Sequence, residues 1–206
     1  VDDSPSMESQ REQLAADATD FVRNLKAQGV DFHIGVTTTD TSPGGPQGAL
    51  VAPYFTPATP DVETRFGAAV QVGISGSSTE RGLEAAQLVL SEPLRSGDNL
   101  GILRDTAGLA LIFVSDDDDQ SPGEVSSYVR FLQQLKAPDG QFRVVANAIV
   151  GDVPGGCPGA AAGVRYAEAA EEQPVSWRMR VVPRRDVQVY EGRNGHRSGS
   201  TFLSVR

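Results

Sequence analysis

The chain of 206 residues is long enough for one domain of ordinary size with a sizeable hydrophobic core. Its hydrophobic content of 39% and charged content of 22% are typical of globular proteins. The net charge of −9 argues against nucleic acid and anionic membranes as partners and is compatible with divalent cations. No apolar run approaches the roughly 20 residues that a membrane-spanning helix needs.

The charge is unevenly distributed along the chain. Residues 1–120 carry 19 acidic and 7 basic side chains, whereas residues 173–206 carry 2 acidic and 7 basic ones. We expect 173–206 to be a divergent basic tail that is poorly ordered or loosely attached. The sequence starts without Met or a signal peptide, so we interpret it as a fragment or a processed product.

Helical and strand patterns alternate along residues 1–172. Apolar residues at helical spacing between Leu14 and Leu25 predict the first helix, and the run Leu109–Val114 is the strongest signal for a buried strand. Thr59 is expected to cap the second helix. The predicted helices cover 8–28, 60–72, 79–90, 124–135 and 164–172, and the predicted strands cover 32–38, 109–114 and 142–150, with a short edge strand over 51–55. This order predicts an α/β fold: a doubly wound, mostly parallel sheet with helices on both faces.

The first seven residues contain the pattern Asp2-x-Ser4-x-Ser6. In an extended segment, side chains two residues apart point the same way, so one carboxylate and two hydroxyls would share one side of a loop. Oxygen donors of this kind suit a hard cation such as Mg²⁺. These residues can also be read as a turn and a helix cap ahead of the first helix.

Two further segments place oxygen side chains where ligands bind in open α/β sheets, beyond the carboxyl ends of the strands. The segment Gly76-Ser77-Ser78-Thr79 precedes a predicted helix, and Asp116 follows the most apolar strand. Together with the first motif, they predict a metal site built from three distant parts of the chain.

The order of these motifs resembles the von Willebrand factor type A (VWA) domain and its metal-ion-dependent adhesion site. Residues 1–7 resemble its Asp-x-Ser-x-Ser element, and Phe113-Val114-Ser115-Asp116 resembles the strand that ends in its last ligand. The stretches 33–40, 80–86 and 147–151 are similar to those expected in envelope or secreted proteins of Gram-negative bacteria, particularly myxobacterial-type ones. The resemblance covers about residues 1–172 and implies a Rossmann-like domain whose first strand is truncated, with only Val1 left.

The resemblance implies that Asp2, Ser4, Ser6 and Asp116 bind Mg²⁺, or Mn²⁺ or Ca²⁺. It also implies a middle ligand, either Ser77, which is slightly preferred, or Thr79. An open coordination position would accept a carboxylate from a protein or cell-surface ligand, which is a binding function without a reaction. The resemblance further implies a cell-envelope or extracellular location.

Three alternatives remain open at this point. The cluster Asp116–Asp119 could serve a metal-dependent hydrolase or phosphotransferase, although no good base or nucleophile accompanies it. The domain could instead be structural, with an unused metal site. Asp117, Asp118 and Asp119 are expected to form a solvated acidic loop, with a second Ca²⁺ contact as the lesser alternative. The only cysteine, Cys157, cannot form an internal disulfide.

Overall fold

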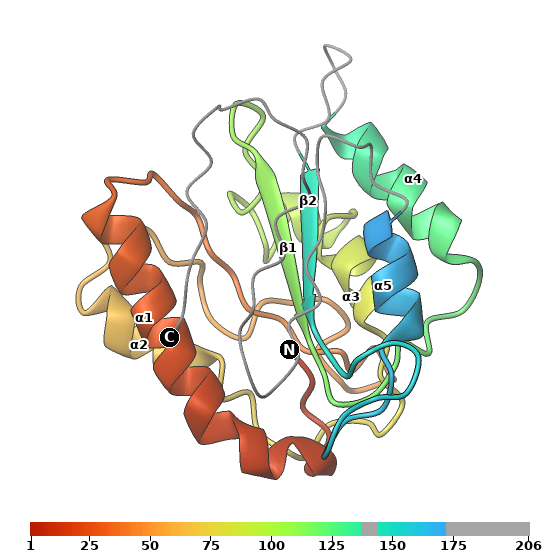
Figure 1. The fold of residues 1–206 in the computed structure, drawn as a ribbon. Coiled ribbons are helices and arrows are strands. Elements are labelled where there is room, and N and C mark those ends of the chain that lie inside the picture. The colour runs from red at the N-terminus through yellow and green to blue at the C-terminus, as the bar shows by residue number, and fades with distance from the viewer. Residues whose placement is uncertain (137–143, 172–206) are drawn as a thin grey trace, which may run out of the picture.

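The computed structural model describes residues 1–136 and 144–171, so the predicted tail at 173–206 lies outside the described residues. Within these ranges the fold is mixed α/β, with five α-helices beside a small parallel sheet (Figure 1). The helices are α1 (Arg11–Ala27), α2 (Val62–Ala69), α3 (Gly82–Val89), α4 (Val125–Leu135) and α5 (Val164–Glu171). Short 3-10 helices cover Pro5–Gln10 and Leu94–Ser96. None of the helices in the described part of the chain is long and apolar enough to cross a membrane.

The sheet consists of two parallel strands, β1 (Leu109–Val114) and β2 (Val144–Ile149). Leu109 pairs with Val144 and Val114 with Ile149, so the two strands run in register over their whole length. The predicted strand over 109–114 is confirmed with its bounds, but it is not buried throughout as expected, because Ala110 and Ile112 are exposed. A parallel pair needs a crossover connection, and α4 supplies it between the two strands.

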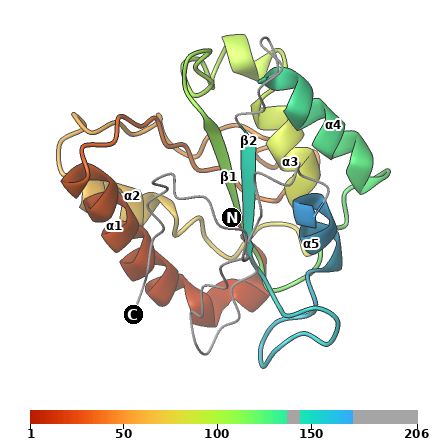
Figure 2. The same ribbon diagram turned by 45° about the horizontal axis from the view of Figure 1, so that its top comes forward.

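Helices flank the sheet on two sides. Helices α3, α4 and α5 lie together on one side, and α1 and α2 lie together on the other (Figures 1 and 2). The first group closes a core around Phe113, whose ring lies 5.1 Å from that of Tyr166. A separate core joins α1 and α2 to the segment before Val36 and includes the edge-to-face pair Phe55 and Phe66.

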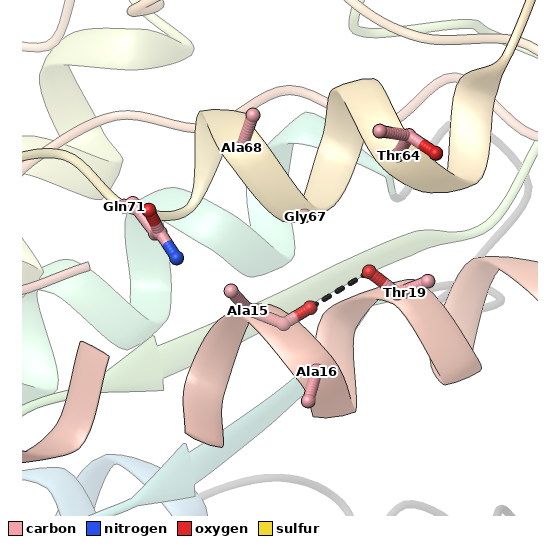
Figure 3. Close-up of a pocket in the computed structure, with 7 residues that line it drawn as sticks. All are labelled: Ala15, Ala16, Thr19, Thr64, Gly67, Ala68 and Gln71. Atoms are coloured by element: carbon pink, nitrogen blue, oxygen red, sulfur yellow. Dashed lines mark hydrogen bonds between the residues drawn. The ribbon is translucent and has the colours of Figure 1, made fainter. Parts of the chain in front are cut away.

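Small residues let α1 and α2 approach closely. A Cβ atom at Gly67 of α2 would lie 2.4 Å from Thr19 Oγ1 of α1, so only glycine fits there. The Thr19 hydroxyl donates a hydrogen bond of 2.8 Å to the carbonyl of Ala15 (Figure 3). A shallow pocket between the two helices has no charged side chain in its lining, which consists of Ala15, Ala16, Thr19, Thr64, Gly67, Ala68 and Gln71. This pocket results from the packing of α1 against α2, and its lining has no charged group that could bind an ion or catalyse a reaction.

The predicted strand over 32–38 is wrong as a continuous strand. Among the described residues it forms one antiparallel bridge, between Ile34 and Phe55, while Val51 N donates to Val36 O at 2.9 Å and the amino group of Val1 donates to Thr37 O. The predicted edge strand over 51–55 is likewise reduced to the bridge at Phe55. These β-branched segments pair through isolated hydrogen bonds, without the ladder that defines a strand.

The predicted helices are present, and the first three are several residues shorter than expected. A 3-10 turn occupies Pro5–Gln10, so α1 begins at Arg11. Thr59 does not cap α2, because its hydroxyl accepts a hydrogen bond of 2.9 Å from Thr56 N instead. Asp61, with a left-handed φ of 48°, occupies the capping position of that helix.

Candidate metal centre

Backbone hydrogen bonds hold the first two residues between two other segments. The amino group of Val1 donates to Thr37 O at 2.9 Å, and Thr39 N donates to Val1 O at 3.1 Å. On the other side, Asp2 N donates to Val114 O, the last residue of β1, at 2.8 Å. Asp2 therefore lies at the carboxyl end of β1, where the sequence predicts the site.

Four of the predicted ligands converge there through their oxygens. Ser6 Oγ donates to Asp116 Oδ1 at 2.9 Å, and Ser4 Oγ lies 2.8 Å from Ser6 Oγ. Asp2 is fixed by two further bonds, from Ser4 N at 2.8 Å and from the Ser115 hydroxyl at 2.6 Å. Residues at the start of the chain and Asp116, 110 positions later, thus form one connected group of hydroxyls and carboxylates.

Burial differs across this group and leaves one side open. Asp2 and Ser4 are buried, whereas Ser6 is exposed and Asp116 is half-buried. Burial raises the pKa of Asp116, the hydrogen bond from Ser6 lowers it, and the nearby charge of Asp2 raises it again. Negative charge is therefore costly at Asp116, and a bound cation would offset that cost.

A buried glutamate that the sequence did not single out adjoins the group. Glu80 is 1% exposed, and its Oε2 accepts a hydrogen bond from the Thr39 hydroxyl. Its Oε1 has no partner among the described residues. Burial chiefly raises the pKa of Glu80 to about 8, with the Thr39 bond opposing the rise and the charges of Asp2 and Asp3 adding to it. In the sequence, Glu80 is marked only by its position next to Thr79 and just before α3. That position is typical of an ordinary acidic residue at the start of a helix.

The predicted middle ligands lie in a loop beside the group. Gly76 N donates to the carbonyl of Asp3 at 2.9 Å, which sets the loop against the first motif. The Ser77 hydroxyl accepts a bond of 3.0 Å from Thr79 N. Among the described residues, no hydrogen bond links Ser77 or Thr79 to the four converging ligands. The choice between them stays open.

The rest of the acidic run does not form a solvated loop, so that expectation is wrong for Asp119. Asp119 is 2% exposed, and its Oδ1 accepts a bond of 3.0 Å from Leu83 N in the first turn of α3. Its Oδ2 pairs with Arg165 Nε at 3.1 Å. Asp118 Oδ1 accepts from Arg165 N, in the first turn of α5, at 2.9 Å. Only Asp117 is exposed as expected.

The donor set that does converge suits a hard cation. Its atoms are carboxylate and hydroxyl oxygens, the ligands that Mg²⁺ and Ca²⁺ prefer. Within residues 1–136 and 144–171, no three His, Cys, Asp or Glu side chains gather to hold a metal by themselves. The predicted set does not need such a cluster, because hydroxyls supply several of its donors. Neither the scan of protein-family models nor the search of curated proteins finds a match to this chain.

Proposed function

We propose that this chain is a divalent-metal-dependent binding module of the VWA type, in which Asp2, Ser4, Ser6 and Asp116 hold Mg²⁺. Mn²⁺ or Ca²⁺ could replace it, and Ser77 or Thr79 would supply the middle ligand. The proposal includes a doubly wound sheet and a place in the cell envelope or outside the cell, both implied by the resemblance.

The observation that carries the proposal is the hydroxyl chain from Ser4 through Ser6 to Asp116. Its two hydrogen bonds of 2.8 and 2.9 Å join the first motif to Asp116, two residues after the end of β1. Nothing in helix capping requires Ser6 and Asp116 to meet, since Ser4 and Ser6 could cap a helix without Asp116. A shared ion gives a reason for the convergence.

Each residue has a distinct part in this binding. Hydrogen bonds from Ser4 N and the Ser115 hydroxyl fix the carboxylate of Asp2, so its negative charge would already be in position for the ion. Ser6 and Asp116 form the accessible side of the group, where a partner would approach. When bound, the ion supplies a coordination position for a carboxylate of a partner protein.

The hydrolase alternative is less well supported. It relies on the run Asp116–Asp119, but Asp118 and Asp119 are already occupied by backbone N–H groups and by Arg165. Arg165 already neutralises the buried carboxylate of Asp119, so that carboxylate is poorly placed to bind a metal or abstract a proton. We therefore propose a binding function without catalysis.

Calorimetric titration with Mg²⁺, Mn²⁺ and Ca²⁺ tests the proposal. Wild type should bind at least one ion, and Ser6→Ala and Asp116→Asn should weaken Mg²⁺ binding at least about tenfold. Asp117→Asn is the matched control, because it removes an exposed carboxylate from the neighbouring position. Unchanged Mg²⁺ affinity in Asp116→Asn, or no Mg²⁺ binding by wild type, would overturn the proposal.

A further inference from the structure

A second pair of buried carboxylates lies beside the first group without belonging to it. Asp3 is 6% exposed and Asp40 is 8% exposed. Both carboxylate-bearing residues contact the same loop: Gly76 N donates to Asp3 O at 2.9 Å, and Ser77 N donates to Asp40 Oδ2 at 3.3 Å. Residues 37 positions apart in the chain thus share one buried corner.

Glycines make room for both carboxylates. A Cβ atom at Gly76 would lie 2.2 Å from Asp3 Cγ, and one at Gly45 would lie 2.7 Å from Asp40 Cγ. Any larger residue at either position would displace the carboxylate. The backbone of two loops therefore encloses this pair closely.

The two carboxylates differ in how far the protein satisfies them. Asp40 accepts hydrogen bonds from Ser42 N, from the Ser42 hydroxyl and from Ser77 N. Asp3 Oδ1, in contrast, is buried and has no hydrogen-bond partner among the described residues. A buried carboxylate oxygen without a partner is costly, so native proteins rarely leave one. The unpartnered oxygen lies against Gly76, next to the residue that contacts Asp40.

A hydroxyl lies at the same corner. Thr38 is 2% exposed, and its Oγ1 accepts a hydrogen bond of 3.2 Å from Asp40 N. Burial raises the pKa of Asp3, a hydrogen bond with Thr38 lowers it, and the charge of Asp40 raises it. Thr38 therefore contacts Asp40 directly and lies near enough to Asp3 to affect its pKa.

We propose that Asp3, Asp40 and the Thr38 hydroxyl bind a second cation of the calcium type. Two carboxylates match a divalent charge, and the unpartnered Asp3 oxygen supplies the free ligand. Ca²⁺ accepts bidentate carboxylates in irregular geometry, whereas Mg²⁺ requires a regular octahedron and usually keeps several waters. The enclosed corner therefore favours Ca²⁺. This site shares no ligand with the Mg²⁺ site and does not rest on the proposed function.

Calcium titration of Asp116→Asn isolates the second site, because that variant disables the first one. We expect Asp116→Asn to bind one Ca²⁺ and to gain thermal stability from it, as seen by calorimetry and thermal unfolding. Adding Asp3→Asn should abolish both effects. Asparagine keeps the shape of the side chain and removes its charge, and Gly76 still leaves room for it.

The competing occupant is a proton shared within the pair. In that case, Asp116→Asn would bind no Ca²⁺, and Ca²⁺ would not change the midpoint of its thermal unfolding. Either result would overturn the proposal. That result decides the question even if the Asp3→Asn variant fails to fold. Because the readout uses a protein without the first site, failure of the Mg²⁺ proposal alone leaves this result unchanged.

Discussion

The two ends of the run Asp116–Asp119 have opposite environments. Asp119 is buried and accepts hydrogen bonds from Leu83 N, from both the backbone N–H and the hydroxyl of Ser121, and from Arg165. Asp116 is half-buried, and its two bonds come from the Ser6 hydroxyl and, at 3.4 Å, from the Gln10 amide. Identical residues in one run therefore have different environments, and Asp119 differs from Asp116 by its burial and by its ion pair with Arg165.

The charged partner matters because it decides whether a carboxylate still needs a cation. The guanidinium of Arg165 already neutralises Asp119. A hydroxyl can also accept, so Ser6 can turn its lone pairs to the same ion that Asp116 binds. Asp119 is thus committed to the fold, and Asp116 remains available to a ligand.

The largest expected effect comes from Asp119→Ala. The change removes the acceptor for Leu83 N and Ser121 N and leaves Arg165 without its carboxylate. We expect the free energy of unfolding to fall by about 2–4 kcal/mol, measured by urea denaturation. Asp117→Ala, at an exposed position, should stay within about 0.5 kcal/mol of wild type. Equal losses of stability in the two variants would contradict a structural role that is specific to Asp119.

Glu80 adds a third environment, a buried carboxylate with an unpartnered oxygen. Burial raises its pKa to about 8 in the folded state, from the usual glutamate value of 4.5. Between these values the unfolded chain loses a proton that the folded chain keeps, so stability falls as pH rises. In EDTA, we expect the free energy of unfolding to decrease by about 1–3 kcal/mol between pH 5 and pH 8.

The variant Glu80→Gln checks the source of this pH dependence. Glutamine cannot ionise, so the decrease between pH 5 and pH 8 should become smaller, as measured by urea unfolding at several pH values. Glu84→Gln, in the first turn of α3, is the matched control and should retain the wild-type slope. An unchanged slope in Glu80→Gln would assign the effect to other groups.

Local patterns in the sequence were sufficient for the most regular elements. Leu109–Val114 is six apolar residues between Gly108 and Ser115, and no other reading fits so short and apolar a run. The helix at 124–135 was also predicted to within one residue, because its apolar residues recur at helical spacing. The convergence of Asp2 and Asp116 could be foreseen, because one of them directly follows a strand of a parallel sheet.

Other features depend on partners far away in the chain. Glu80 is buried because Thr39, 41 positions earlier, and Asp2 lie against it. Asp119 is structural because Arg165, 46 positions later, reaches it. Composition predicts an exposed acid in both places, since charged residues are seldom buried without a partner. Only the tertiary arrangement reveals these partners.

The smallest effect on stability is expected for Asp116→Asn, which tests the other end of the acidic run. In EDTA, the loss of charge relieves repulsion with Asp2, so the free energy of unfolding should stay within about 0.5 kcal/mol of wild type. With saturating Mg²⁺, wild type should gain stability by mass action, whereas the variant should gain at least about 1.4 kcal/mol less. Asp117→Asn should respond to Mg²⁺ like wild type. Urea unfolding with and without the ion measures all three proteins, and a loss in EDTA as large as that of Asp119→Ala would make Asp116 structural as well.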